Sequence, residues 1–446
     1  MSTNTTKQAG SGWTFAIRAL RSRNYRLFFG GQSISLIGTW MTRIAQAWLV
    51  YRLTGSAFLL GVIGFAGQIP TFLIGPFAGV WVDRLNRHRV LVLTQTLSML
   101  QSFALAALTL THRITFWDIL WLSLFQGVVN AVDMPGRQAF VVQMVENRSD
   151  LGNAIALNSS MVNAARLVGP SIAGLIIAAS NEGVCFLIDG ISYSAVILSL
   201  LMMHIAPQVA RSKTTEARVL HDLREGWTYV SRFHPIRSIL ILLALISLFG
   251  MPYTVLMPVF ASQVLHGGPH TLGFLMGATG VGALLAAMRL AARKTVLGLG
   301  RTIPYAAGLF GIALMLFASS RVIWISLPLM LVAGYAMITQ LASSNTILQT
   351  IVSDEKRGRV MSFYSMAFTG MAPFGSLLAG TVASRIGAPG MLRIGGGVCV
   401  LAGIWFATQL KQVRELIHPI YRDLGILPEV ATGIQSAATL STPPEG

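Results

Sequence analysis

GVWVDRLNRHR at residues 79–89 and ARLVGPSIAG at residues 165–174 place charges and helix-bending residues within otherwise apolar sequence. The first stretch separates two long apolar runs, and the second puts Arg166 and the Gly169-Pro170 pair inside a third. A charged side chain is costly in a lipid bilayer and tends to persist there for a functional reason. Both stretches therefore indicate a chain that crosses a membrane several times.

The composition supports this interpretation. Of the 446 residues, 53% are hydrophobic and only 11% are charged, and the mean hydropathy is +0.64. An average soluble domain carries roughly 25% charged residues. Apolar runs of about 20 residues, long enough to cross a bilayer, recur along the chain. They predict an all-α integral membrane fold with twelve spans at 27–51, 57–81, 90–111, 116–134, 154–179, 184–205, 237–260, 271–291, 303–319, 322–348, 360–384 and 389–410.

The net charge of +17 does not indicate nucleic-acid binding, because the basic residues lie in short connectors between the apolar runs. On one side of the predicted membrane the connectors and tails hold 26 of the 33 Lys and Arg residues, and on the other side they hold 5. Basic connectors face the cytoplasm. We therefore predict a multi-pass protein of the cell inner (plasma) membrane with both termini in the cytoplasm.

The long basic connector divides the spans into two sets of six. We predict a cytoplasmic N-terminal lead-in (1–26), an N-terminal six-helix bundle (27–205), a cytoplasmic linker (206–236), a C-terminal six-helix bundle (237–410) and a cytoplasmic tail (411–446). Within the linker, residues 221–230 are compatible with a helix on the membrane surface. Residues 145–157 and 352–363 begin similar spans about 205 residues apart, which indicates weak internal symmetry of the kind that transporters often have. Chance similarity between two apolar helices remains an alternative.

Polar side chains recur at helical spacing along four of the spans. Such stripes must face one another or water, because an unsatisfied polar group in hydrocarbon costs several kcal/mol. Helix packing through Ser, Thr and Asn is the alternative explanation. The predicted cavity and substrate residues are Gln32, Thr39, Arg43, Gln46, Gln126, Asn130, Asn163, Tyr335 and Thr339.

Three charged residues within spans are candidates for proton coupling: Asp133, Arg166 and Asp189. Asp189 is the most deeply embedded of the carboxylates. Desolvation favours the neutral form of a carboxylic acid, as a proton carrier requires. A static ion pair of Asp189 with Arg166 or Arg43 is the alternative.

The loop after the second span predicts a conformational latch formed by Gly79, Asp83, Arg84 and Arg87. The glycine would let another helix approach, and the aspartate would accept hydrogen bonds at a helix N-terminus. In span five, Gly169 and Pro170 would bend the helix and Gly174 would permit close packing.

These stretches resemble known motifs. Residues 79–89 resemble the major facilitator superfamily motif Gly-x-Leu-Ala-Asp-Arg-x-Gly-Arg-Lys, and residues 165–174 resemble its span-five antiporter motif. GTWMTRIAQAWLV at 38–50, PGRQAF at 135–140, NAIALNS at 153–159 and RGRVM at 357–361 resemble the enterobactin-exporter and macrolide-efflux branch. The resemblance implies the major facilitator fold, with two six-helix bundles that rock around a central site. It also implies drug- or siderophore-like cargo moved outward in exchange for protons.

The sequence also departs from its drug-antiporter relatives, in which span four usually carries an arginine. Here Gln126 and Asn130 lie in that region, so Arg166 with Asp133 or Asp189 would have to take over the proton relay.

We expect no catalytic residues, metal or cofactor, because the sequence lacks the HExxH, P-loop and embedded Ser/His/Asp patterns. The expected function is a proton-coupled exporter of a small amphipathic drug, macrolide or siderophore, acting in the lipid bilayer as a monomer. The alternatives are an importer of a small metabolite with the same fold, or a transport-inactive membrane partner or sensor.

Overall fold

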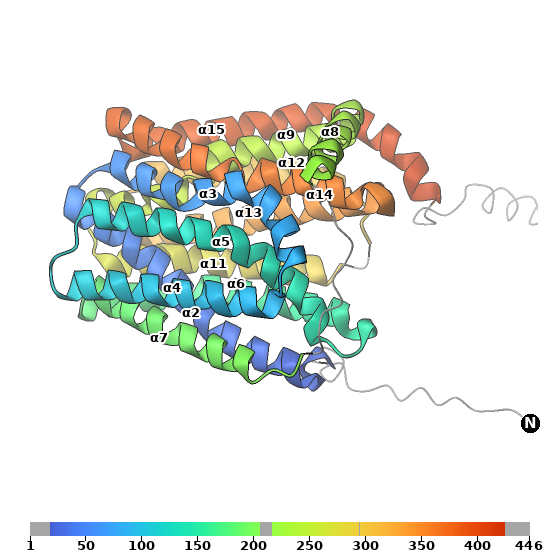
Figure 1. Ribbon diagram of the computed structural model, residues 1–446. Helices are drawn as coiled ribbons and strands as arrows, with labels where there is room; N and C mark the ends of the chain where they lie inside the picture. The colour runs from blue at the N-terminus through green and yellow to red at the C-terminus, as the bar shows by residue number, and fades with distance from the viewer. Residues whose placement is uncertain (1–17, 206–215, 294, 424–446) are drawn as a thin grey trace, which may run out of the picture.

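The computed structural model describes residues 18–205, 216–293 and 295–423. These residues form helices and contain no strand, and most of the helices run side by side along one direction (Figure 1). The N-terminal half comprises η1 (Arg18–Arg21), α2 (Arg23–Thr54), α3 (Ala57–Arg84), α4 (Arg87–Leu110), α5 (Phe116–Met144), η2 (Arg148–Asp150), α6 (Leu151–Ala179) and α7 (Glu182–Leu201). The rest comprises α8 (Glu216–Arg232), α9 (His234–Leu245), η3 (Ile246–Gly250), α10 (Tyr253–Val259), η4 (Phe260–Val264), α11 (Pro269–Ala291), α12 (Leu299–Ser319), α13 (Ile323–Ile351), α14 (Asp354–Phe368) and α15 (Ala372–Asp423).

Each of the twelve predicted spans coincides with a helical segment. Nine helical regions of the described chain are long and apolar enough to cross a membrane. Those nine do not include α2 and α5, whose polar stripes lower their average hydropathy. The last two predicted spans fall in one of the nine, the continuous region Glu355–Asp423. The number of crossings therefore stays a prediction, whereas the all-helical architecture is established.

Local sequence explains where several helices begin or change. Thr115 and Asp118 form a reciprocal capping box at the start of α5, as expected for an acidic residue in a first turn. The π-helical turn η3 comes just before Pro252, and the π-helical turn η4 comes just after Pro258, so the seventh predicted span is irregular near both prolines. Gly387 has a φ of 79° and interrupts α15. Glycine adopts a positive φ at little cost, which allows the chain to turn at this position. The turn lies between the eleventh and twelfth predicted spans.

Within each half, helices pack against partners that are distant in sequence as well as against their neighbours along the chain. In the N-terminal half, α2 packs against α6 and α7, and α5 packs against α3 and α4. In the C-terminal half, α12 packs against α13 and α15, and α11 packs against α13. In Figure 1, α15, α9 and α12 of the C-terminal half lie at the top and α4, α2 and α7 of the N-terminal half at the bottom, while α3 and α11 lie in the region between them. This is the arrangement that the resemblance implied.

The two halves meet through glycines at two places. On one side α6 contacts α11, where a Cβ atom added to Gly174 would lie 2.9 Å from the Cα atom of Gly273. On the other side α3 contacts α15, where a Cβ atom added to Gly61 would lie 2.9 Å from the Cα atom of Gly380. All four glycines lie toward the helix ends that we predict to face away from the cytoplasm. The close packing expected at Gly174 is therefore present in the structure.

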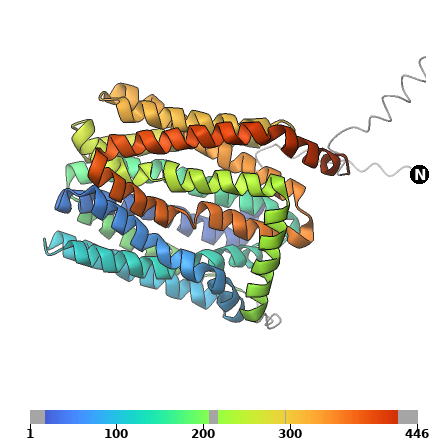
Figure 2. The ribbon, with the colours of Figure 1, turned by 90° about the horizontal axis from the view of Figure 1, so that it is seen from above.

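A helix that crosses the others covers part of the opposite end. α8 runs across the bundle in Figure 2 and packs against α9 and α14. The first residues of α2 and the last residues of α15 lie at this same end (Figure 1). Residues 221–230 are therefore helical, as predicted. The expected lead-in (1–17), part of the linker (206–215) and the tail after Asp423 lie outside the described residues.

Candidate transport site

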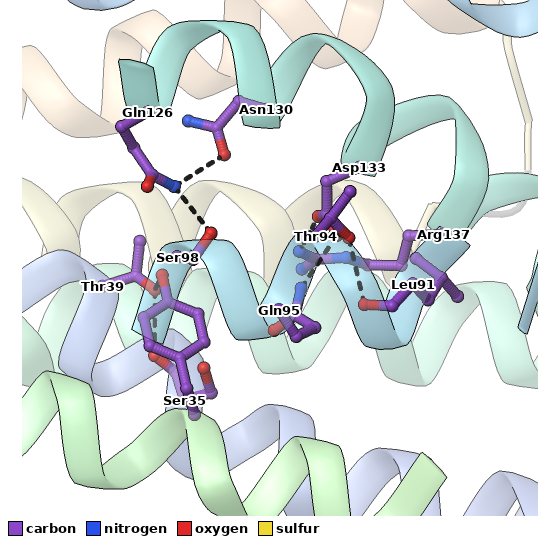
Figure 3. A network of polar contacts seen from close by, with 11 residues as sticks. Ser35, Thr39, Leu91, Thr94, Gln95, Ser98, Gln126, Asn130, Asp133 and Arg137 are labelled. Carbon is purple, nitrogen blue, oxygen red and sulfur yellow. Dashed lines mark hydrogen bonds and ion pairs between the residues drawn. The ribbon is translucent and has the colours of Figure 1, made fainter. Parts of the chain in front are cut away.

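The first polar cluster surrounds Asp133 on α5, which is 2% exposed (Figure 3). Its Oδ1 atom accepts hydrogen bonds of 2.8 Å from both Thr94 Oγ1 and Gln95 Nε2 on α4. Its Oδ2 atom pairs with Arg137, one helical turn further along α5. Both carboxylate oxygens are thus satisfied. A buried carboxylate with these partners has its charge compensated, and we assign it a structural role in holding α4 against α5.

The second cluster surrounds Asp189 on α7, which is 1% exposed. Its Oδ2 atom accepts hydrogen bonds from Thr42 Oγ1 at 2.8 Å and Ser102 Oγ at 2.9 Å. Its Oδ1 atom is buried without a hydrogen-bond donor among the described residues. A Cβ atom added to Gly38 on α2 would lie 2.6 Å from that same oxygen. The ion pair with Arg43 or Arg166 that the sequence left open is not formed in the described chain.

Two arginines lie against one aromatic ring beside this cluster. The guanidinium carbon of Arg43 is 4.7 Å from the centre of the Trp40 ring, and that of Arg166 is 5.0 Å away. The α6 backbone comes close here, because a Cβ atom added to Gly169 would lie 2.6 Å from Trp40 Cβ. The span-five glycine thus brings the two arginine-bearing helices together.

Several of the other predicted cavity residues bond to neighbouring helices. Gln46 Nε2 donates to Ser123 Oγ at 2.6 Å, and Gln126 Nε2 donates to Ser98 Oγ at 3.0 Å and to Asn130 Oδ1 at 3.3 Å. The first bond joins α2 to α5. Figure 3 shows the Gln126–Ser98 bond, which joins α5 to α4. These bonds fit the helix-packing alternative as well as the cavity prediction.

The remaining predicted cavity residues have different surroundings. Thr39 lies 3.4 Å from the Tyr193 hydroxyl, and Gln32 is buried. On α6 the Asn163 amide donates to the Ser159 carbonyl at 2.9 Å. On α13 the Tyr335 hydroxyl accepts from Arg289 of α11, and Thr339 is buried without a partner among the described residues. The structure thus places Thr39 beside Tyr193 of α7, whereas Tyr335 bonds to Arg289 and belongs to the pair of helices α11 and α13.

The predicted latch differs from the sequence expectation in two respects. α3 continues to Arg84, so Gly79 and Asp83 are helical, and only Leu85 and Asn86 separate α3 from α4. Nothing lies within 4 Å of a Cβ atom added to Gly79, so the close helix approach expected at that glycine is absent from this structure. Arg87 donates to the Ala139 carbonyl on α5 at 3.4 Å. The side chain of Asp83 is outside the described part of the structure.

Sequence reasoning missed Trp40, Thr42, Ser102 and Tyr193. Trp40 and Thr42 lie shortly before Arg43 in the sequence, and this proximity could have identified them as candidates for the site. Ser102 and Tyr193 come from α4 and α7, and their positions depend on helix packing. Across the described residues no cluster of three or more His, Cys, Asp or Glu residues has metal-binding geometry.

Comparison with known proteins identifies the family. The family described as transmembrane secretion effector matches residues 14–418. The chain is 27% identical to the staphyloferrin A transporter of Staphylococcus aureus (87% of this chain, 97% of that protein) and 26% identical to the multidrug efflux pump Tap of Mycolicibacterium fortuitum (85% and 93%). Among solved structures, it is similar to a bacterial homologue of the iron transporter ferroportin in an inward-facing state (TM-score 0.68, 15% identity, 87% of this chain and 98% of that chain).

The chain belongs to the transmembrane secretion effector family of major facilitator superfamily transporters. The predicted superfamily and the resemblance to its siderophore and macrolide efflux branch are confirmed. The chain is therefore a transporter of small molecules rather than an enzyme, and a multi-pass inner membrane protein.

Proposed function

We propose that this transporter is a proton-coupled exporter of a small amphipathic compound such as a drug, a macrolide or a siderophore. The observation that carries the proposal is the buried Asp189 carboxylate, which lies beside Arg43 without an ion pair. The relatives named for efflux support outward transport, since they match the chain over most of its length. The two halves act as the two rocking bodies, with residues 27–205 in one and 237–410 in the other.

The orientation follows from the basic connectors. With both termini in the cytoplasm, α8 also lies on the cytoplasmic side, and the glycine contacts between the halves lie on the opposite side. Ser159 and Ser160, on the cytoplasmic half of α6, are exposed. This arrangement supports a state that loads its cargo from the cytoplasm, as an exporter must.

Asp189 is the proposed proton carrier, and Asp133 is not. Among the described residues Oδ1 of Asp189 has no donor, so we assign the proton to this oxygen, while Thr42 and Ser102 donate to Oδ2. Taking up or releasing that proton changes the charge next to Arg43 and Trp40. Asp133 instead forms an ion pair with Arg137, so its carboxylate already has a cation partner.

The latch is proposed for a different conformation, in which α3 approaches the C-terminal half at its cytoplasmic end. Gly79 is then the close-contact position and Asp83 the hydrogen-bond acceptor. Gly79→Leu and Asp83→Asn should each lower transport without reducing the amount of protein in the membrane. Normal transport by both variants would contradict the latch.

The function is tested by export from efflux-deficient cells that express the chain and are loaded with dyes, macrolides or siderophores. We expect at least one compound to leave faster than from cells carrying the empty vector, and a protonophore to stop this export. Proteoliposomes with an imposed pH gradient then give the direction of transport. Uptake in place of export, or export that persists with no proton gradient, would contradict the proposal.

A further inference from the structure

Trp40, Arg43 and Arg166 form a cluster that we call the arginine–tryptophan site. The two guanidinium groups approach the same indole, and their positive charges repel each other. Arg43 is exposed, and Arg166 is half-buried. Because a charged group within a predicted membrane span is costly in contact with lipid, the accessible face of Arg43 should meet water or a solute.

Neither arginine has a counter-ion close enough to form an ion pair. In the part of the chain that the structure describes, Arg43 and Arg166 form no hydrogen bond and no ion pair, and the Nε atom of Arg166 is buried without an acceptor. Asp189 attracts Arg43 from a distance but is held by Thr42 and Ser102. Arg166 also interacts electrostatically with Tyr253 on α10. Through this tyrosine the C-terminal half contributes to the surroundings of the cluster.

The charges do not balance even when Asp189 is ionised, because two arginines then face one carboxylate. Asp133 cannot contribute, since Arg137 already neutralises it. An unpaired cation in a membrane-embedded region is unfavourable and persists mainly where function needs it. A bound anion would remove this cost.

We propose that the arginine–tryptophan site binds an oxyanion, such as a carboxylate, on the transported compound. Guanidinium groups match the geometry of oxyanions through paired hydrogen bonds, and the Trp40 ring offers an apolar face to the remainder of an amphipathic molecule. The inference rests on the proposed transport of a small amphipathic compound, and it narrows that class to compounds with an acidic group.

The test measures binding to the purified full-length chain in detergent, without transport. Cys185 and Cys399 are both buried, so a thiol-reactive fluorogenic dye reports unfolding. The probes are naphthalene-2-carboxylate and the uncharged naphthalene-2-carboxamide, at fixed ionic strength. We expect the carboxylate to raise Tm by about 2 °C at tenfold its Kd, and the carboxamide to have no effect.

Three variants locate the effect. Arg43→Gln and Arg166→Gln should abolish the shift, whereas Arg113→Gln, at an exposed position, should retain it while removing the same charge. Without probe, Arg166→Gln should unfold at or above the wild-type temperature because it removes an unpaired charge. Arg137→Gln, which breaks an ion pair, should unfold at a lower temperature.

The proposal is overturned if the carboxylate produces no shift, if both probes act equally, or if the shift survives in Arg166→Gln. Because the assay needs no gradient, its outcome is independent of the export assay. A chain that binds the carboxylate but exports nothing would contradict the proposed function alone. A chain that exports but shows no preference for the carboxylate would contradict the oxyanion site alone.

Discussion

Asp133 and Asp189 are both buried in the N-terminal half, yet their surroundings are opposite. Asp133 has an arginine partner on its own helix and donors for both oxygens. Asp189 has donors for one oxygen only, and the two nearest arginines lie against a tryptophan instead. A compensated charge stabilises a fixed packing, whereas an uncompensated one changes its state readily when a proton or a ligand arrives. Within one bundle, Asp133 therefore has the surroundings of a structural residue, whereas Asp189 has those of a functional one.

The largest expected effect is on transport by Asp189→Asn. The amide cannot exchange a proton, so export should fall at least about 10-fold, as for loss of a proton-transfer group, and should no longer respond to the pH gradient. The measurement is cargo efflux from proteoliposomes at several imposed gradients. Asp133→Asn is the matched control and should leave the gradient response intact. An unchanged response in Asp189→Asn would remove this residue from the mechanism.

The next largest effect concerns stability. Arg137→Gln leaves Asp133 as a buried carboxylate without its cation, which costs about 3 kcal/mol. We expect a lower Tm in the thiol-dye assay and partial recovery in the double variant Asp133→Asn, Arg137→Gln. If the single variant unfolds at the wild-type temperature, the pair is not the structural element that we describe.

A smaller effect is expected from Gly38→Ala. The added methyl group would lie 2.6 Å from Asp189 Oδ1, so α2 and α7 would have to separate or the carboxylate would have to move. The expected result is a several-fold lower export rate and a destabilisation of about 1–3 kcal/mol. Gly30→Ala on the same helix is the control, because nothing lies within 4 Å of a Cβ atom there. Equal behaviour of the two variants would show that Asp189 tolerates displacement.

The smallest expected effects come from removing a single hydroxyl group from each of the two clusters. Thr94→Val removes one donor from Asp133 but leaves Gln95, so it should cost about 1 kcal/mol of stability and leave export unchanged. Thr42→Val removes a donor from Asp189 and should lower export several-fold with a similar small change in Tm. The contrast fails if both variants lower export, or if neither does.

Much of the helical framework could be predicted from the sequence, because it depends on local patterns. The apolar runs placed the helices, and the capping box of Thr115 and Asp118 at the start of α5 is likewise formed by residues close in sequence. The polar stripes of α2 and α5 were visible at helical spacing, and the partner of Asp133 is one turn away on the same helix. These features need no knowledge of how helices pack.

The rest of the candidate site depends on tertiary contacts. Thr42 and Ser102 reach Asp189 from α2 and α4, and Arg166 reaches Trp40 only because Gly169 lets α6 approach. The spacing of polar residues along one helix does not predict which residues of other helices they contact. The contact expected at Gly79 is absent from this conformation and stays a prediction for another, since a glycine shows that a helix can approach but not when it does so.

The unpaired charge of the arginine–tryptophan site also has an electrical consequence. With Asp189 ionised, Arg43 and Arg166 leave one excess positive charge, and a singly charged anionic cargo cancels it in the loaded carrier. The carrier that returns without cargo holds the exchanged proton on Asp189, so the two arginines give it two excess positive charges. A charge that crosses the full membrane potential changes energy by about 2.3 kcal/mol per 100 mV. The loaded carrier would then reorient with little dependence on voltage, while an inside-negative potential would draw the empty carrier back to face the cytoplasm. Cargo release would therefore be followed by a return step powered by voltage, and turnover should rise as the membrane becomes more polarised.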